Sequence, residues 1–452
     1  MIRRLVLGAV VFGSLIAPAS GAADPLRIGS FVVDASPPLG SPLAYDRCDA
    51  VGMPLTARGI VLLGGRQPIV LCAVDWIGMS NGGYHRWRDA IAKAVGTSPE
   101  RVAIHALHQH DAPRCDFDAE RLLAEQGVGG AMFDVAFARQ TIKNVAEAAK
   151  QAVGSASAVT HLGLGQAKVE KVASNRRILG ADGKVKFVRY TTCTDPEMRA
   201  EPEGTIDPYV KSISFWNEEK PLVVLTYYAT HPQSYYRTGV AHADFPGIAR
   251  FLRQTTLNGL THVHFNGAGG NIGAGKYNDG AHENRQTLAV RLADGMAAAY
   301  LATEKHLLTA DDIGWRTVSV VLPPSPHLSE ETLLATLTDN KVATDQRTYA
   351  AKDLVWLRRC AARETIDLTC LKLGPARILN MPGELAVEYQ LAAQKMRPDF
   401  FVAMAAYGEY APGYICLKEH YSQGGYEDSP AASKVAPEVE EVLMPAMAEL
   451  LK

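Results

Sequence analysis

Potential metal ligands follow four separate apolar segments of this sequence. His108 and His110 come after one apolar segment, and His231 comes after another. A third segment leads through a Met-Pro-Gly turn to Glu384, and a fourth leads into the tyrosine-rich segment 407–426. Histidine nitrogens and carboxylate oxygens are the donors that catalytic zinc sites use. These segment ends are therefore candidates for one metal site assembled from distant parts of the chain.

The stretch 101–113 contains three histidines that strand geometry separates into two groups. If residues 102–107 form a strand, successive side chains point to opposite faces. His108 and His110 then share one face, and we expect His105 on the other face to be packed or hydrogen-bonded in the core. His108 and His110 lie at the carboxyl end of the predicted strand, where sites gather in α/β folds.

Zinc chemistry would explain this choice of residue types. A catalytic zinc ion keeps a few N or O ligands from the protein and leaves one position open for water, whose pKa it lowers toward neutrality. The sequence has no Cys-x-x-Cys pair, so thiolate ligands are not expected. Alternatively, each residue only satisfies hydrogen bonds at a strand end. Spacing alone leaves both interpretations open, because the ligands come from distant segments.

Strands and helices that alternate along the chain would position these side chains. Residues 58–65 and 67–76 are predicted to form a hairpin, and the β-branched and aromatic content of 211–217 and 221–232 is typical of strands. Apolar periodicity predicts helices over residues 82–96, 135–153 and 288–300. The pattern indicates a mixed α/β protein in which β-sheets are stacked and flanked by helices, in a single large catalytic domain.

One segment, 320–332, is the best candidate for a domain boundary because it is rich in proline. The chain beyond it is nevertheless expected to return strands to the same core.

Composition excludes one class of function. The 452 residues are 47% hydrophobic and 21% charged, as in a folded protein with a sizeable core. The formal net charge is -2, and no run of lysine and arginine is present. A phosphate backbone would require such a run, so nucleic-acid binding is not expected.

The N-terminus has the three parts of a secretory signal. Arg3 and Arg4 precede an apolar stretch at 5–17, and small residues follow at 19–23. The apolar stretch is short for a membrane span, which needs ~20 residues. We expect a signal peptide over 1–23 and a secreted or periplasmic catalytic domain over 24–452, with no transmembrane segment after cleavage. A retained membrane anchor is the alternative.

Seven cysteines are too few for a disulfide scaffold and are odd in number. Cys360 and Cys370 are the nearest pair in the sequence and are a candidate bridge, although connectivity cannot be deduced from spacing.

Three motifs resemble those of the neutral, non-lysosomal ceramidase family of zinc-dependent amidases. The segment "LHQHDAP", residues 107–113, stands where the family has "THTHSGP". The family's "ATH" after a strand is matched at 229–231, and its "PGE" turn is matched at 382–384.

The tyrosine-rich segment adds a fourth motif. In the family, a ligand tyrosine is followed by tyrosines seven and twelve positions on, and Tyr414, Tyr421 and Tyr426 keep this spacing. The last lies within "YED", where the family has "YEG". The resemblance extends from "VVDASPPLG", residues 32–40, to this segment and so covers most of the chain.

The resemblance implies a role for each matching residue. The implied Zn²⁺ ligands are His108, His231, Glu384 and Tyr414. His110 would lie beside the metal as a base or hold the bound water. Arg176, within "SNRRILG", resembles the family's arginine that meets the substrate, and Tyr426 resembles its second active-site tyrosine.

Two aspartates are candidates for orienting the ligand histidines. Asp75 follows a predicted strand, and Asp244 lies in "HADFPG". A carboxylate hydrogen-bonded to a ligand histidine fixes its tautomer and orientation. The alternative is that both are structural carboxylates at a strand end and a turn.

The glycine-rich segment 267–280 departs from the family pattern. Ceramidases carry "GDVSP" here, whereas Asn271 replaces the aspartate and Gly273 takes the position of the serine. Glycine has no nucleophile, so covalent serine catalysis is not available at this position. Attack by zinc-bound hydroxide does not need the serine. Backbone N–H groups of the loop would face an oxyanion, or the loop is only a tight turn.

Length is the second departure. Ceramidases carry an added immunoglobulin-like β domain after the catalytic one, and we expect this chain to lack it. Contacts to lipid that the extra domain helps to provide, and ceramide itself as the substrate, are therefore not implied.

Our hypothesis from the sequence is a secreted zinc-dependent hydrolase that cleaves an amide bond, N-acyl and ceramide-like, through zinc-activated water. Its substrate would be a small-molecule or lipid-like acyl amide. One alternative keeps the zinc site but acts on an ester or another acyl linkage. The other is a non-catalytic binding protein of the same fold.

Overall fold

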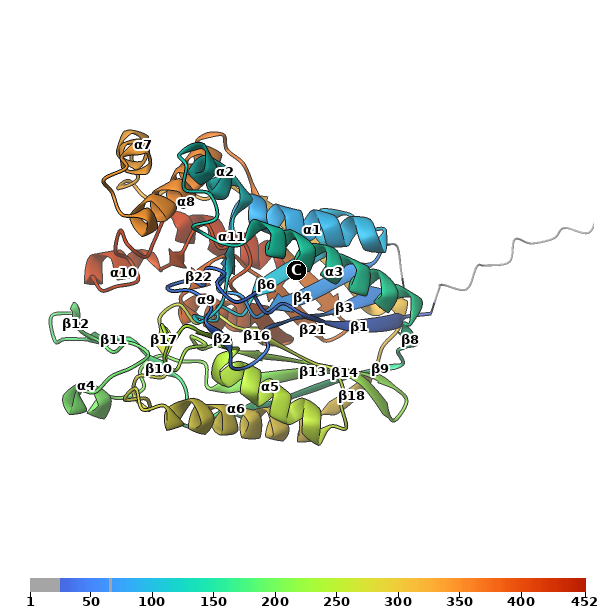
Figure 1. Ribbon diagram of the computed structural model, residues 1–452. Helices are drawn as coiled ribbons and strands as arrows, with labels where there is room; N and C mark the ends of the chain where they lie inside the picture. The colour runs from blue at the N-terminus through green and yellow to red at the C-terminus, as the bar shows by residue number, and fades with distance from the viewer. Residues whose placement is uncertain (1–24, 65–66) are drawn as a thin grey trace, which may run out of the picture.

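The computed structural model describes residues 25–64 and 67–452. Three main β-sheets form its centre and helices cover their outer faces, which confirms the predicted mixed α/β class (Figure 1). The predicted signal peptide lies outside the described residues. Among the helices that are described, none has the length and apolar character to cross a membrane.

The first sheet has the strand order β6-β4-β3-β1-β8. Its strands are β1 (Arg27–Asp34), β3 (Thr56–Leu63), β4 (Ile69–Val74), β6 (Val102–Ala106) and β8 (Ser157–Ala158). β3 and β4 pair antiparallel, which confirms the predicted hairpin, and β4 pairs parallel with β6. The predicted helices α1 (Gly82–Val95) and α3 (Val135–Gly154) cover one face, and α1 ends where Gly96 adopts the left-handed conformation (φ 74°).

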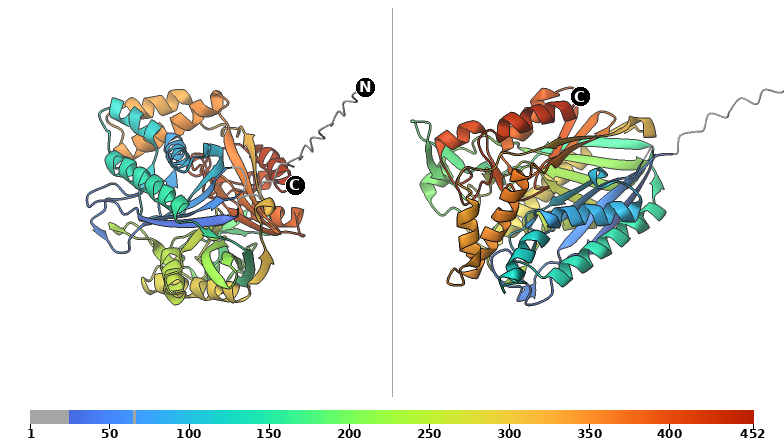
Figure 2. Two further views of the ribbon diagram at one scale, coloured as in Figure 1. Left: turned by 90° about the vertical axis from the view of Figure 1, so that its right-hand side faces the viewer. Right: turned by 90° about the horizontal axis from the view of Figure 1, so that it is seen from above.

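The second sheet has the strand order β16-β14-β13-β9-β18. Its strands are β9 (His161–Lys168), β13 (Tyr209–Asn217), β14 (Lys220–Tyr228), β16 (His262–Asn266) and β18 (Glu304–Leu307). Ile213 and Phe215 of β13 pack toward the first sheet, whereas Val210 packs toward the helices α5 (Asp244–Thr256) and α6 (Glu283–Leu301). Figure 2 shows the resulting layers, with α1 and α3 outside one sheet and α5 and α6 outside the other.

The third sheet has the order β19-β20-β21-β23 and lies beside the first two. Its strands are β19 (Ile313–Val320), β20 (Ile366–Leu373), β21 (Ala376–Asn380) and β23 (Phe401–Ala405). β19 precedes the proline-rich segment 320–332 and β20 follows it, yet the two strands pair along their whole length. The segment therefore does not separate two domains, because the chain returns to the same sheet.

Further elements complete the envelope. The remaining helices are α2 (Phe117–Glu125), α4 (Pro196–Ala200), α7 (Glu330–Thr338), α8 (Thr344–Ala361), α9 (Val387–Met396), α10 (Lys418–Gln423) and α11 (Val439–Leu450). Short strand pairs are β2 (Ala50–Val51) with β15 (Val240–Ala241), β5 (Gly78–Met79) with β7 (Arg114–Cys115), β10 (Ser174–Asn175) with β17 (Ile272–Gly273), β11 (Arg177–Leu179) with β12 (Val185–Val188), and β22 (Glu384–Leu385) with β24 (Tyr414–Ile415).

Each main sheet contains one parallel strand pair. These pairs are β4 with β6, β14 with β16, and β21 with β23. The carboxyl ends of parallel neighbours lie at one edge of a sheet, where ligands of α/β proteins bind. The segments that leave β6, β14, β21 and β23 are the four that carry the predicted metal ligands.

All seven cysteines are buried and free. The candidate bridge between Cys360 and Cys370 was therefore wrong. Cys360 lies near the end of α8 and Cys370 lies within β20, and both thiols are packed in the apolar core.

Candidate metal centre

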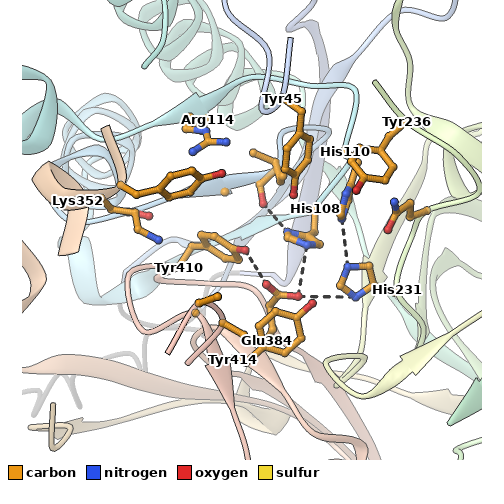
Figure 3. A pocket seen from close by; sticks show the side chains of 18 of the residues that line it. Tyr45, His108, His110, Arg114, His231, Tyr236, Lys352, Glu384, Tyr410 and Tyr414 are labelled. Carbon is orange, nitrogen blue, oxygen red and sulfur yellow. Dashed lines mark hydrogen bonds and ion pairs between the residues drawn. The ribbon is translucent and has the colours of Figure 1, made fainter. Parts of the chain in front are cut away.

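Four segments from three sheets converge on one buried site. His108 and His110 follow β6, His231 follows β14, Glu384 begins β22, and Tyr414 begins β24 (Figure 3). Glu384 and Tyr414 are direct neighbours in the parallel β22–β24 pair. The backbone N–H of His231 donates to the carbonyl of Ile272 at 3.2 Å, which ties its segment to the glycine-rich loop. The structure thus brings together residues that are separated by up to about three hundred positions in the sequence.

Three donor atoms lie at separations that suit a metal ion. Glu384 Oε2 is 3.4 Å from His108 Nε2 and 3.7 Å from His231 Nδ1. Two ligand atoms at zinc bond lengths and tetrahedral angles lie roughly 3.4 Å apart. Glu384 Oε2 and His231 Nδ1 are buried and have no hydrogen-bond partner among the described residues. Such orphaned polar atoms are costly unless another group satisfies them, so this donor set fits a metal.

His108 is oriented by the backbone. Its Nδ1 lies 2.7 Å from the carbonyl oxygen of Ile77, which makes Nδ1 the protonated nitrogen and leaves the Nε2 lone pair free to face Glu384. The backbone of His108 has φ 56°, a conformation that is uncommon for a residue with a side chain. Backbone strain of this kind tends to occur at functional sites.

Strand alternation does not direct His108 and His110, contrary to the prediction for this stretch. The strand ends at Ala106, and the left-handed backbone conformation of His108 then directs the two histidine side chains. Both rings nevertheless reach the same site, 4.9 Å apart between centroids. The prediction for His105 is confirmed, because its Nδ1 contacts the carbonyl of Ala406 and its Nε2 accepts from the N–H of Asn266. Burial lowers the pKa of His105 to about 3.

His110 offers a second possible donor set. Its Nε2 lies 3.1 Å from Nε2 of His231, and the side-chain nitrogens of His108, His110 and His231 all lie within 4.8 Å of one another. Tyr45 stacks on the His110 ring at 5.5 Å, and Tyr236 meets it edge-on at 5.1 Å. Two sets of ligands, one with Glu384 and one with His110, therefore share the same two histidines.

The three histidines are held neutral. Burial, followed by the mutual repulsion of neighbouring charges, lowers the pKa of His110 and of His231 well below the usual value, and burial lowers the pKa of His108. Metal binding requires the neutral imidazole, so the environment prepares these residues for ligation at neutral pH.

Two tyrosines that the sequence analysis did not single out support the ligands. The Tyr410 hydroxyl donates to Glu384 Oε1 at 2.6 Å, which leaves Oε2 to face the histidines. The Tyr407 ring stacks on His108 at 5.0 Å between centroids. Both belong to the tyrosine-rich segment, so the density of tyrosines there was the available signal.

Arg176 links Tyr414 and Tyr426. It donates to the Tyr414 hydroxyl at 3.1 Å, and its guanidinium carbon lies 5.4 Å from the centroid of the Tyr426 ring. Its Nε lies 3.3 Å from Oε1 of Glu427, a buried carboxylate that the sequence analysis missed although it directly follows Tyr426. Tyr421, the remaining tyrosine of the motif, instead donates to the carbonyl of Val435.

The glycine-rich segment supports the site from behind. Asn271 accepts from the N–H of Val387 and donates to Glu388, so its side chain fixes the start of α9. A Cβ at Gly270 would overlap the backbone carbonyl oxygen of Glu384. None of the described residues that line the cavity belongs to 267–280, so the expectation of an oxyanion-binding loop lacks support.

Asp75 and Asp244 do not orient the ligand histidines. Asp75 accepts from both terminal nitrogens of Arg250, at 2.9 and 2.6 Å. Asp244 bonds the backbone of Ser234 and lies 3.3 Å from Arg285. Both are structural carboxylates; the Ile77 carbonyl orients His108 instead, and Tyr410 orients Glu384.

A cavity of about 700 Å³ opens above the ligands. This volume is within the usual range for small-molecule sites. Its wall includes the predicted residues His108, His110, Arg176, His231, Glu384, Tyr414 and Tyr426.

The fold is that of neutral ceramidases. A ceramidase complexed with C2 superposes with a TM-score of 0.69 and 14% identity, over 94% of this chain and 75% of that one. The neutral ceramidase from Pseudomonas aeruginosa gives 0.66 and 15% identity, over 94% and 73% of the two chains. No family model matches the sequence, and no curated protein matches it.

Proposed function

We propose that this protein is an exported, zinc-dependent hydrolase of acyl amides. The observation that carries the proposal is the convergence of His108 Nε2, His231 Nδ1 and Glu384 Oε2 at 3.4 to 3.7 Å beside a cavity. The choice of an amide rests on the fold that the chain shares with two ceramidases. The choice of export rests on the N-terminal sequence pattern alone.

We assign the zinc ligands to His108, His231, Glu384 and Tyr414. Zinc in such a site supplies a Lewis acid that polarises a carbonyl group and lowers the pKa of water. Tyr410 holds Glu384 in place, and the pairing of β22 with β24 puts Tyr414 next to it.

The chain's own groups would then handle the substrate. His110 lines the cavity with its Nε2 3.1 Å from Nε2 of His231, so it is placed to hold the attacking water or to accept its proton. Burial raises the pKa of Tyr426 to about 12, so its hydroxyl keeps its proton and can donate to an oxygen on which negative charge develops. Arg176 lies next to Tyr426 and would hold the same oxygen or a polar head group.

Metal analysis together with an activity assay tests the proposal. Purified protein should contain about one zinc ion and hydrolyse N-acyl amides. His231→Ala and Glu384→Ala should lose both zinc and activity. Glu419→Ala, which removes an exposed carboxylate on α10, is the matched control and should retain both.

The same series separates the two donor sets. Our assignment predicts that His110→Ala keeps its zinc but loses most of its activity. If His110→Ala loses zinc and Glu384→Ala retains it, the three-histidine set is the correct one.

A panel of N-acyl amides and matching esters would distinguish amide from ester hydrolysis. Zinc-loaded protein that turns over no acyl substrate would indicate a binding protein.

A further inference from the structure

Positive charge exceeds negative charge on the wall of the cavity. Its cationic lining residues are Arg114, Arg176, Arg237, Lys352 and Lys434. Among the described lining residues, the carboxylates are only Asp116 and Glu384. Glu384 faces the histidines, and burial raises the pKa of Asp116 to about 7, which reduces its charge near neutral pH. A low-dielectric cavity with this balance attracts an anion.

Two of these cations already have carboxylate partners. Arg176 lies 3.3 Å from Glu427, and Lys434 lies 2.9 Å from Asp353. Their charges are therefore largely compensated within the protein.

Arg114 and Lys352 are different. The Arg114 guanidinium donates to the carbonyl of Ala44 and makes no ion pair within the described chain. Lys352 Nζ lies 3.7 Å from Asp353, but that carboxylate is already bonded by Lys434 at the shorter distance of 2.9 Å. Both cations can therefore take an additional anionic partner.

These two side chains lie close to the candidate zinc ligands. Lys352 Nζ is 5.9 Å from the centroid of the Tyr410 ring, and the hydroxyl of Tyr410 bonds Glu384 at 2.6 Å. One tyrosine side chain thus separates the ammonium group from a metal ligand. Figure 3 shows Arg114 and Lys352 together on the side of Tyr410 that is away from His231.

Tyr349 lies beside Arg114 on the cavity wall. Its ring lies 5.4 Å from the Arg114 guanidinium carbon. Burial by itself would raise the pKa of this tyrosine, yet its pKa is lowered, because the charge and hydrogen bond of Arg114 and then the charge of Lys352 favour the phenolate. Arg114 and Lys352 therefore make this part of the wall cationic.

The apolar part of the wall comes mainly from tyrosine rings and less from aliphatic side chains. Its aliphatic side chains are Ile77, Met132, Ala431 and Ala432, and the other lining residues are mostly aromatic, polar or charged.

We propose that Arg114 and Lys352 form a subsite for a carboxylate on the substrate, so that the enzyme prefers N-acylated amino acids to uncharged lipid amides. This inference rests on the proposed amide hydrolysis. Arginine and lysine bind carboxylates through charge-assisted hydrogen bonds. Hydrolysis consumes one water, breaks the amide C–N bond, and releases a carboxylic acid and an amino acid.

A pair of substrates that differ in one charge tests the subsite. N-hexanoylglycine carries a carboxylate, and N-hexanoylpropylamine is an uncharged counterpart of similar size. The zinc-loaded wild type should show a higher kcat/KM for the acid. Lys352→Met should lower the ratio of the two kcat/KM values by about 10- to 100-fold, the usual effect of losing a hydrogen bond between charged groups. Lys341→Met, an exposed lysine before α8, should keep the wild-type ratio.

A ratio near one in the wild type, or an unchanged ratio in Lys352→Met, would overturn the subsite while leaving amide hydrolysis intact. If neither substrate is hydrolysed, the proposed function fails, and calorimetric binding then decides the subsite. N-hexanoylglycine should bind the zinc-loaded wild type at least about 10-fold more tightly than zinc-loaded Lys352→Met. Carboxylate binding to the metal itself is common to both proteins, so equal affinities would overturn the inference.

Discussion

Tyr410→Phe should weaken zinc binding without removing any ligand. The Tyr410 hydroxyl donates to Glu384 Oε1 at 2.6 Å, and this bond leaves Oε2 facing His108 at 3.4 Å. Loss of a partner that orients a ligand typically costs 10- to 100-fold in metal affinity. A factor of ten corresponds to about 1.4 kcal/mol, so we expect the variant to lose about 1.4 to 2.7 kcal/mol of binding free energy.

Tyr407→Phe is the matched control. Tyr407 lies three positions away in the same segment, its ring stacks on His108, and its buried hydroxyl has no hydrogen-bond partner among the described residues. Removing that hydroxyl keeps the stacking and leaves no polar group unsatisfied. The zinc affinity of Tyr407→Phe should therefore stay within about twofold of the wild type.

Competition with a chromogenic zinc chelator at pH 7.5 measures both affinities. Circular dichroism and urea denaturation of the zinc-free proteins check that each variant folds. If the two variants weaken zinc binding equally, the effect is one of packing and the reasoning about Glu384 is refuted. An unchanged affinity in Tyr410→Phe would show that Glu384 does not bind the metal.

Three further predictions concern stability. A Cβ at Gly270 would overlap the backbone carbonyl of Glu384, whereas a Cβ at Gly273 would meet its nearest neighbour, Thr191 Oγ1, at 3.4 Å. Gly270→Ala should therefore lower the free energy of unfolding, measured by urea denaturation, by about 1–3 kcal/mol, while Gly273→Ala should change it by less than about 1 kcal/mol. Similar losses in the two variants would contradict this difference in packing. Asp75→Ala leaves Arg250 buried without its carboxylate partner and should cost about 3–5 kcal/mol by the same measurement; a loss below about 1 kcal/mol would mean that the pair is dispensable. Asp116 has its pKa raised by burial to about 7, so between about pH 4 and 7 the folded state holds a proton that the unfolded chain has released. The stability from this group is complete below about pH 4 and is lost as the pH rises through about 7. The free energy of unfolding of Asp116→Asn should therefore rise relative to that of the wild type between pH 5 and pH 8. A difference between the two proteins that does not change with pH would refute the raised pKa.

The local pattern of the sequence was enough to predict most of the elements that carry the site. The hairpin of β3 and β4, the helices α1, α3 and α6, and the packed position of His105 all follow from residue periodicity, because period and burial are properties of neighbouring residues. The four segments that end in candidate ligands were found in the same way. The resemblance of short motifs then connected them, and the neutral-ceramidase fold was confirmed.

Local pattern was not enough where an outcome depends on segments that meet only after folding. The orientation of His108 by the Ile77 carbonyl, the support of Glu384 by Tyr410, and the true partners of Asp75 and Asp244 all join different segments of the chain. Whether Cys360 and Cys370 form a disulfide also depends on contacts between distant segments, and both thiols are free.

The sequence by itself therefore determined which residues were available for metal chemistry and on which segments they lie. The tertiary structure decided which atoms face each other, and it revealed the cationic pair of Arg114 and Lys352 beside the site. The physical reason is that spacing specifies a side chain's face on its own strand or helix. The order and pairing of three sheets, set by packing between distant segments, decide what that face meets.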